Sequence, residues 1–256
     1  MSETPQEGDM SFLEHIGELR SRLVVVAASI AALSILGWSY SKETFDLISA
    51  PFFTAFEGDV LIGTGPAEAF LLRLKVAVLV GTLLSVPIIF HQCWIFISPG
   101  LLEHERKFAL PFVLITSGLF LGGVWFCYSV VLPFAFEFFK SQYTAVGSVT
   151  PTIRISEFLS LLVKALLGFG VIFETPVLAF ILGRLGVINA KMLMNAGRYA
   201  VVGIFLISAV LTPPDVLTQF LMAGPLMALY GLSIVIVSLT GKTDQEETEA
   251  SPAKEE

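Results

Sequence analysis

Long uninterrupted runs of apolar residues constrain the fold of this 256-residue chain more than any other feature. Only helices and closed barrels satisfy every backbone group in lipid, and these runs lack the period-two alternation of barrel strands. Each run is close to the roughly 17–25 residues that a transmembrane helix needs. The predicted spans are residues 22–40, 70–97, 108–132, 157–182, 196–212 and 216–239. The sequence therefore predicts an all-α, polytopic membrane protein whose six transmembrane helices form one domain over residues 1–240.

The composition agrees with this class. Hydrophobic residues make up 55% of the chain and charged residues only 14%, whereas soluble domains carry about 25% charged residues. The first residues, "MSETPQEGDMSFLEH", are acidic and lack a basic n-region, so no cleavable signal or transit peptide is expected. Residues 241–256 are predicted to be a disordered acidic tail, which accounts for much of the net charge of −7.

The distribution of lysine and arginine favours both termini on the cytoplasmic side. An even number of spans places the two ends on one side, and short cytoplasmic loops are enriched in cations. With the termini inside, nine of the cations are cytoplasmic and six are not. The cytoplasmic set is Arg20, Arg22, Arg106, Lys107, Arg184, Lys191, Arg198, Lys242 and Lys254.

The connections are uneven in length. Residues 41–69, which contain "SAPFF" with Pro51, are predicted to lie along the membrane surface or to fold as a short cap. Short helices are also expected in residues 133–156. The last connection is only "TPPD", residues 212–215, so the fifth and sixth spans should form a tight hairpin in which the fifth span is short.

Prolines in or near the spans are expected to kink several helices, because each proline removes one backbone donor. Bent helices packed together would form a cupped, concave wall. The prolines concerned are Pro87, Pro111, Pro133, Pro176 and Pro225.

A first polar feature is the segment "SFLEHIGELRSRL", which precedes the first span. Its apolar residues recur at helical spacing: Phe12, Ile16, Leu19 and Leu23. The segment is therefore predicted to be an amphipathic helix. Glu18 lies four residues before Arg22, which is compatible with an ordinary solvated ion pair. The alternative is a carboxylate held at the membrane surface for a cationic partner.

A second polar feature is the short loop "PGLLEHERKF" between the second and third spans. Glu103, Glu105, Arg106 and Lys107 are residues that a short cytoplasmic loop normally carries. Spacing alone does not separate that interpretation from a binding role.

A third polar feature is Glu174, which is surrounded by apolar residues in "LLGFGVIFETPVLAF". A charge at the bilayer centre costs about 2.5–3.5 kcal/mol on insertion scales, so this group must be protonated, paired or hydrated. Lys164 lies ten residues away, about 15 Å along a helix, which is too far for a direct pair. One interpretation is a polar clamp on the backbone that Pro176 leaves open; the other is a functional, hydrated cavity.

Metal, cofactor and catalytic motifs are not recognisable. Cys93 and Cys127 form no CxxC and have no histidine at metal spacing. An intramembrane hydrolase needs paired catalytic groups at membrane depth, and no such pair is found. A proton-coupled small-molecule carrier could use one buried glutamate, but such carriers usually show repeats and several midplane polar groups. The carrier remains the alternative function.

Five motifs occur in a fixed order: "FLEHIGELRSRL", "SAPFF", "SVPIIFHQCWIFISPGLLEHERK", "GFGVIFETPV" and "LTPPDVLTQ". Together they closely resemble the signature stretches of the TatC family, the large membrane subunit of the twin-arginine protein translocase. The resemblance extends from about residue 11 to residue 239. It implies six spans, cytoplasmic termini, a concave wall and a prokaryotic cytoplasmic membrane.

The resemblance also implies functional residues. The family's two carboxylates for twin-arginine signal peptides fall on Glu18 and Glu105, with Arg20 and Gln92 as supporting members. Glu103 departs from the basic residue expected before "HER". Glu174 falls where the family carries a polar residue, and it is interpreted as a contact for a partner's transmembrane helix. Asp215 matches a further family position and is expected to cap the sixth span.

The implied partners are signal peptides of folded cargo, single-span subunits of the TatA and TatB type, the lipid bilayer and further copies of this chain. No nucleic-acid partner and no cofactor are indicated. The sequence contains no P-loop, so the energy for transport is expected to come from the proton-motive force. The chain is not expected to be an enzyme.

Overall fold

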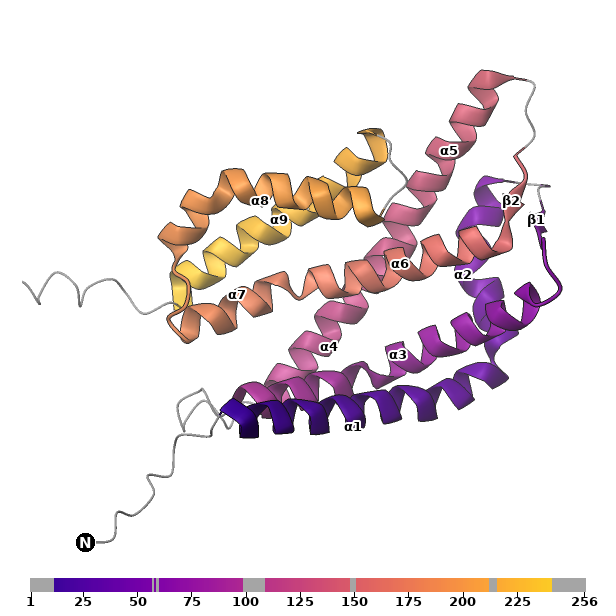
Figure 1. Cartoon of the computed structure of the whole chain (residues 1–256). Helices are drawn as coiled ribbons and strands as arrows, with labels where there is room; N and C mark the ends of the chain where they lie inside the picture. The colour runs from indigo at the N-terminus through magenta and orange to yellow at the C-terminus, as the bar shows by residue number, and fades with distance from the viewer. Residues whose placement is uncertain are drawn as a thin grey trace, which may run out of the picture. The chain divides into compact units, whose positions relative to one another are not determined.

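The computed structural model describes residues 12–56, 58, 60–98, 109–147, 151–211 and 216–240. Its helices are α1 (Phe12–Ser39), α2 (Ser41–Ala55), α3 (Glu68–Ile97), α4 (Ala109–Phe126), α5 (Leu132–Val146), α6 (Ile155–Phe173), α7 (Thr175–Arg184), α8 (Ala190–Leu211) and α9 (Val216–Thr240) (Figure 1). A π-helical turn, η3 (Cys127–Val131), joins α4 to α5. Two short strands, β1 (Leu61–Ile62) and β2 (Ile153–Arg154), pair in parallel.

Six helical stretches within the described residues are long and apolar enough to cross a membrane. They are Ile16–Ser39, Glu68–Ile97, Ala109–Val146, Ile155–Arg184, Ala190–Val210 and Thr218–Thr240. The predicted all-α class with six spans is therefore confirmed.

The third span continues without a break into the helix expected after it. The span was predicted to end near residue 132 with short helices in residues 133–156; α5 is such a helix, and α4, η3 and α5 form one helical stretch of 38 residues that ends at Val146. At 1.5 Å per residue this is roughly 57 Å, about twice the 30 Å of a hydrocarbon core. The predicted end follows the hydropathy of the side chains, whereas the end of the helix follows its backbone hydrogen bonds, which continue past the end of the apolar run.

The fifth span also differs from the prediction, which began it at residue 196 and made it short. α8 begins at Ala190 and has 22 residues, which is about 33 Å and sufficient to cross the bilayer. The Asn189 side chain accepts a hydrogen bond from the backbone N–H of Met192 at 2.7 Å, the usual arrangement of an N-cap. Lys191 and Arg198 lower the hydropathy of these first turns without ending the helix. Residues 212–215 lie outside the described residues.

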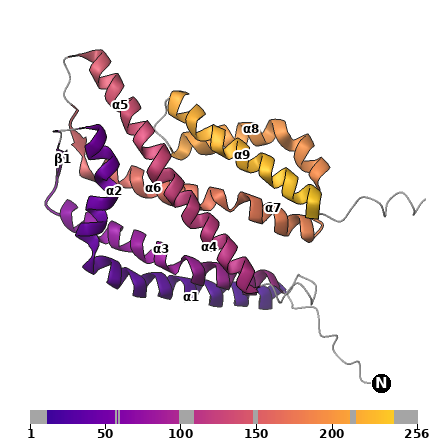
Figure 2. The same cartoon turned by 180° about the vertical axis from the view of Figure 1, so that it is seen from behind.

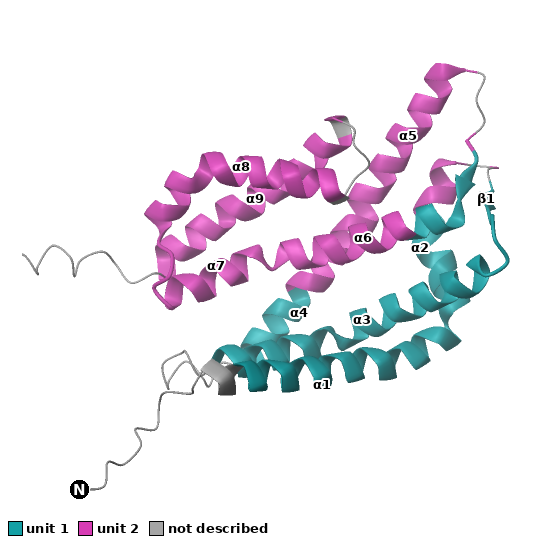
Figure 3. Ribbon diagram, viewed as in Figure 1, with its two compact units in different colours: residues 1–50, 60–118, 152–159 teal, residues 51–59, 119–151, 160–256 magenta. Residues whose placement is uncertain are grey.

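The chain divides into two compact units, shown in different colours in Figure 3. Unit 1 comprises residues 1–50, 60–118 and 152–159, and unit 2 comprises residues 51–59, 119–151 and 160–256. In unit 1, α1 and α3 lie side by side along their length, as both Figure 1 and the reverse view in Figure 2 show.

Two glycines bring the backbones of α1 and α3 together. A Cβ atom added to Gly37 of α1 would lie 2.6 Å from the Ala77 carbonyl oxygen. A Cβ atom added to Gly81 of α3 would lie 2.2 Å from Ser34 Oγ and 2.8 Å from the Ile30 carbonyl oxygen. No side chain fits at either point, so the two helices approach each other as closely as small residues allow in membrane proteins.

The turn from α1 to α2 is fixed by an arginine of α3. Arg73 donates a hydrogen bond from Nε to Oγ of the fully buried Ser41 at 3.0 Å. Its guanidinium carbon lies 4.6 Å from the Trp38 ring centroid, a favourable cation–π distance. The Trp38 and Phe70 rings meet edge to face at 5.7 Å. These contacts hold the start of α2 against α3.

The segment between α2 and α3 is ordered by a strand pair and by an acidic side chain. Leu61 pairs with Ile153, and Ile62 pairs with Arg154. At the start of α3, the Glu68 carboxylate accepts hydrogen bonds from the backbone N–H groups of Thr64 and Gly65. A carboxylate here also complements the positive end of the α3 dipole.

Unit 2 uses the same kind of close packing. A Cβ atom on Gly123 of α4 would lie 2.6 Å from the Phe169 carbonyl oxygen of α6. A Cβ atom on Gly170 of α6 would lie 2.6 Å from the tip of the Phe120 ring of α4. The last turns of α4 and of α6 are therefore in direct contact, with aromatic rings beside the glycines.

The α8–α9 pair is held by hydrogen bonds from side chains of one helix to the backbone of the other. Tyr230 of α9 donates its hydroxyl hydrogen to the Leu193 carbonyl oxygen at 2.6 Å. Gln219 Nε2 donates to the Phe205 carbonyl oxygen at 2.8 Å. The Phe205 and Phe220 rings pack edge to face at 4.9 Å. Contacts at both ends of the pair fix the two helices side by side.

Of the prolines expected to kink helices, Pro87 lies inside α3 and Pro225 inside α9, and Pro51 of the "SAPFF" segment lies inside α2. Pro111 is the third residue of α4. Pro133 and Pro176 instead come directly after irregular positions within longer helical stretches: Pro133 lies two residues after η3, and Pro176 lies two residues after Glu174, as is common where proline disturbs a helix. The residue after Pro51, Phe52, is buried and packs edge to face against Phe136 of α5 at 5.6 Å.

We predict that Gly81→Ala destabilises the protein by about 1–3 kcal/mol, the usual cost of overpacking. The added methyl group would meet the backbone of α1, which cannot move aside as a flexible side chain could. The measurement is the thermal unfolding midpoint of the purified protein in detergent.

Gly118→Ala is the matched control, because nothing lies within 4 Å of the position of its added Cβ atom. It should unfold at the wild-type temperature or slightly above. Equal midpoints for the two alanine variants would show that close contact of α1 and α3 at Gly81 does not stabilise the protein.

Candidate functional site

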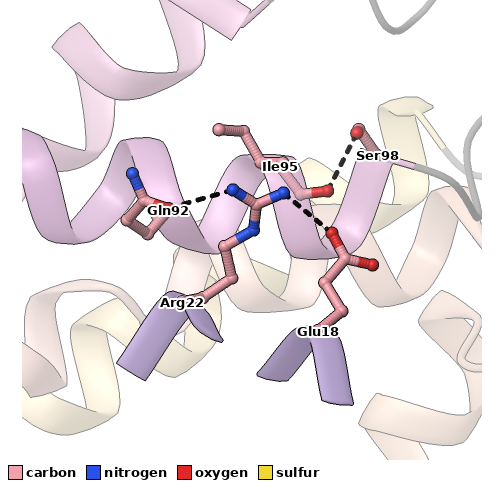
Figure 4. A network of polar contacts seen from close by, with 5 residues as sticks. All are labelled: Glu18, Arg22, Gln92, Ile95 and Ser98. Atoms are coloured by element: carbon pink, nitrogen blue, oxygen red, sulfur yellow. Dashed lines mark hydrogen bonds and ion pairs between the residues drawn. The ribbon is translucent and has the colours of Figure 1, made fainter. Parts of the chain in front are cut away.

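The candidate site lies in unit 1, where the first turns of α1 approach the last turns of α3. Glu18 and Arg22 are four residues apart on α1, so their side chains lie on the same face of the helix. Arg22 Nη2 donates to Glu18 Oε1 at 3.0 Å, which makes this hydrogen bond an ion pair. Arg22 Nη1 lies 3.5 Å from Gln92 Oε1 of α3. Figure 4 shows the guanidinium between the two acceptors.

Parts of both charged groups remain unused. The ion pair involves only Oε1 of Glu18, and within the described residues Oε2 makes no hydrogen bond; Figure 4 shows it pointing away from Arg22. Arg22 Nε is buried and likewise has no hydrogen-bond partner in the described part of the chain. The carboxylate can therefore accept further donors, and the guanidinium is incompletely satisfied.

Partial exposure limits the strength of this ion pair. The side chains of Arg22 and Glu18 are 31% and 19% exposed. Exposed pairs contribute about 0.2–1 kcal/mol, because water screens the charges and two long side chains must be ordered. The pair therefore orients the carboxylate more than it stabilises the fold.

The structure brings together two of the four predicted binding residues. Glu18 and Gln92 are linked through Arg22, whereas Arg20 is exposed and has no hydrogen bond or ion pair among the described residues. Glu105 lies outside the described residues, as does Asp215. Beside the network, Ser98 Oγ donates to the Ile95 carbonyl oxygen at 3.2 Å in the last turn of α3.

The sequence interpretation missed Arg22 as a member of the site. The spacing of Glu18 and Arg22 does predict an ion pair, and that part could be found without a structure. The contact with Gln92 joins residues 70 positions apart, and no local pattern indicates it.

Glu174 occupies a second polar position, in unit 2, at the junction between α6 and α7. It is only 6% exposed, and its Oε1 has no hydrogen-bond partner in the described part of the chain. The backbone of Phe120, on α4, forms a hydrogen bond to its carboxyl group. The predicted fourth span is therefore interrupted as a regular helix at this glutamate.

The interpretation of Glu174 as a clamp on the backbone opened by Pro176 is wrong. Pro176 lacks the N–H that would bind the Ile172 carbonyl oxygen in a regular helix. The Thr175 hydroxyl donates to that oxygen at 2.6 Å instead. Glu174 is directed to the neighbouring helix α4, so its carboxyl group links two helices and leaves one oxygen unsatisfied.

Metal ligands do not cluster in the described residues, where no group of three or more His, Cys, Asp or Glu side chains could hold an ion.

Comparison with known proteins gives a consistent result. The family profile described as "Sec-independent protein translocase protein (TatC)" matches residues 14–225. Proteins of that name from Desulforapulum autotrophicum and Helicobacter pylori strain J99 are 37% and 38% identical to this chain. The alignments cover 96% and 94% of this chain and 91% and 95% of those proteins.

Two solved structures are also similar over most of the chain. The crystal structure titled "Twin Arginine Translocase Receptor- TatC" superposes with a TM-score of 0.79 at 33% identity, covering 88% of this chain and 99% of that one. The structure of the same receptor in DDM has a TM-score of 0.81 at 32% identity.

We predict that Glu174→Gln unfolds within a few degrees of the wild type, whereas Glu174→Ala is destabilised by about 1–3 kcal/mol. Glutamine keeps the side-chain length and an oxygen for the contact with the Phe120 backbone, while alanine loses that contact and opens a cavity. Thermal unfolding in detergent measures both, with Glu157→Ala as an exposed control on α6. An alanine variant as stable as the glutamine variant would contradict a stabilising role for the Phe120 contact.

Proposed function

This chain belongs to the TatC family of Sec-independent protein translocase proteins, and we propose that it is the receptor and scaffold subunit that binds twin-arginine signal peptides of folded cargo. The solved relatives are titled as twin-arginine translocase receptors. The chain is a multi-pass membrane protein with six apolar helices. Family membership does not favour the alternative of a proton-coupled carrier.

One observation carries the proposal: Glu18 already binds a guanidinium, and its second carboxylate oxygen has no hydrogen-bond partner in the part of the chain that the structure describes. A half-buried carboxylate that holds an arginine of its own chain has the position and exposure needed to hold an arginine of a peptide. Glu105, in the matching motif "EHERK", would provide the second carboxylate. Arg20 and Gln92 would support the two.

A site of this kind should prefer arginine to lysine. A guanidinium is planar and binds a carboxylate through two parallel hydrogen bonds, whereas the lysine ammonium is a strongly hydrated point charge. Two carboxylates at fixed positions would each bind one of two adjacent guanidinium groups.

The setting of the site follows from the same assignment. We place both termini and the Glu18 end of α1 in the cytoplasm of a prokaryotic cell, with the spans in its cytoplasmic membrane. Single-span subunits of the TatA and TatB type and further copies of this chain would complete the translocase. The proton-motive force would provide the energy, since binding a signal peptide does not itself move the cargo.

Glu174 is proposed to contact a polar segment in the transmembrane helix of a single-span partner. The supporting observation is its buried Oε1, which has no hydrogen-bond partner among the described residues, because a buried oxygen without a donor is costly in lipid. Since Glu174→Gln should preserve the fold, cross-linking of that variant to the single-span subunits tests this role separately from stability. Unchanged cross-linking and unchanged export would refute it.

The receptor function is tested by binding of a labelled twin-arginine signal peptide to the detergent-purified full chain. We expect wild type to bind, and Glu18→Ala and Glu105→Ala each to weaken binding by about 10- to 100-fold. That range corresponds to losing one hydrogen-bonded charge pair of about 1.5–3 kcal/mol.

A twin-lysine peptide is the ligand control and should bind about tenfold or more weakly than the arginine peptide. Equal binding of both peptides would mean that the surface is merely acidic. A wild-type protein that binds neither peptide would refute the receptor proposal itself.

A further inference from the structure

Glu18, the carboxylate assigned above to the signal peptide, is already occupied by a side chain of the same protein. Arg22 presents to Glu18 the same guanidinium that a twin-arginine peptide would present, at 3.0 Å. We infer that Arg22 is a resident competitor, which holds Glu18 in the unliganded receptor and must release it when a signal peptide binds. This inference rests on the proposed receptor function and adds to it a residue that sets the affinity of the site.

The contacts of Arg22 allow this release. A guanidinium offers five N–H donors, and a firmly held arginine makes two parallel bonds to one carboxylate. Arg22 makes one such bond to Glu18, a longer contact of 3.5 Å to Gln92, and none from its buried Nε among the described residues. A peptide arginine that binds Glu18 through two parallel bonds would therefore replace a single bond.

Gln92 provides a place for the displaced guanidinium. Its Oε1 already faces Arg22 Nη1 (Figure 4), so Arg22 keeps one acceptor on α3 after it leaves Glu18. Without Gln92 the displaced cation would remain partly buried with no acceptor in the described network, and displacement would be less favourable. Gln92 thus raises the affinity for the peptide by accepting the displaced Arg22, and not by acting on Glu18.

Competition of this kind has a distinct signature. It reduces the fraction of receptors whose Glu18 is available and raises the apparent dissociation constant of every ligand at that carboxylate by the same factor. The contact of Arg22 with Glu18 is present in the free receptor and absent from the complex with the peptide. Arg22 should therefore set the absolute affinity and the association rate, while the preference for arginine over lysine and the dissociation rate stay unchanged.

The experiment measures binding of twin-arginine and twin-lysine peptides to the detergent-purified full chain, with wild type and Arg22→Gln compared. The inference expects Arg22→Gln to bind both peptides about two- to fivefold more tightly, the range that corresponds to a partly exposed ion pair. The ratio of the two affinities and the dissociation rates should not change. Weaker or equal binding of the arginine peptide, at an unchanged unfolding midpoint, would overturn the inference, because Arg22 would then position Glu18 or be irrelevant to it.

Two further variants separate competition from a general effect of charge. Arg22→Lys keeps the charge but not the planar fork, so the inference expects intermediate affinity; wild-type affinity in Arg22→Lys would assign the effect to charge alone and overturn it. Arg154→Gln is the matched control, because Arg154 forms a comparable pair with Glu157 at 3.6 Å on an exposed surface. It should bind both peptides as wild type does.

A double-mutant cycle tests the role of Gln92. Gln92→Leu should weaken binding in the wild-type background and have no effect in the Arg22→Gln background, since its action depends on Arg22. Equal weakening in both backgrounds would refute Gln92 as the second acceptor. Absence of any peptide binding to the wild type would refute the receptor function, which is a different outcome from all of these.

Discussion

Direct contact of two backbones aligns α1 with α3, and the polar site at the end of the pair depends on that alignment. Gly37 meets Ala77, and Gly81 meets the backbone around Ser34. Arg22 lies 15 residues before Gly37, and Gln92 lies 15 residues after Ala77. In an antiparallel pair these equal separations, roughly 22 Å each at 1.5 Å per residue, bring the two polar side chains to the same level. The glycines therefore determine which residue of α3 faces Arg22.

Most of the architecture could be predicted from the sequence, because lipid leaves few options for a backbone. Six apolar runs became six helices for that reason. The prediction differs from the structure where hydrogen bonding, and not hydropathy, sets the helix ends: Asn189 starts α8 before its apolar part, and the expected helix after the third apolar run is continuous with that span. The Asn189 cap was recognisable in the sequence. The contact of Arg22 with Gln92 was not, since it depends on the packing of distant segments.

The two notable glutamates differ in what surrounds them. Glu18 is partly exposed, is paired with a cation and keeps an oxygen available to ligands that arrive from water. Glu174 is buried at an interruption between two helices and is bound to the backbone of Phe120. The sequence singles out Glu174 because a carboxylate in an apolar run is rare, and the structure shows it buried; its contact on α4 required the tertiary structure. The Ile172 carbonyl oxygen, which loses its usual donor at Pro176, accepts a hydrogen bond from the Thr175 hydroxyl and not from Glu174.

The π-helical turn η3 has a consequence for the angular phase of the third span. A π-turn holds one residue more than an α-turn in the same rise, and one residue corresponds to about 100° of rotation about the helix axis. Cys127–Val131 therefore resets the direction in which α5 presents its side chains relative to the end of α4. Gly123 faces α6 on one side of this turn, and Phe136 faces Phe52 on the other. The same residues wound as a regular α-helix would rotate α5 by about 100° relative to the end of α4 and turn one of these contacts away from its partner, so the π-turn sets the angle between the two contacts.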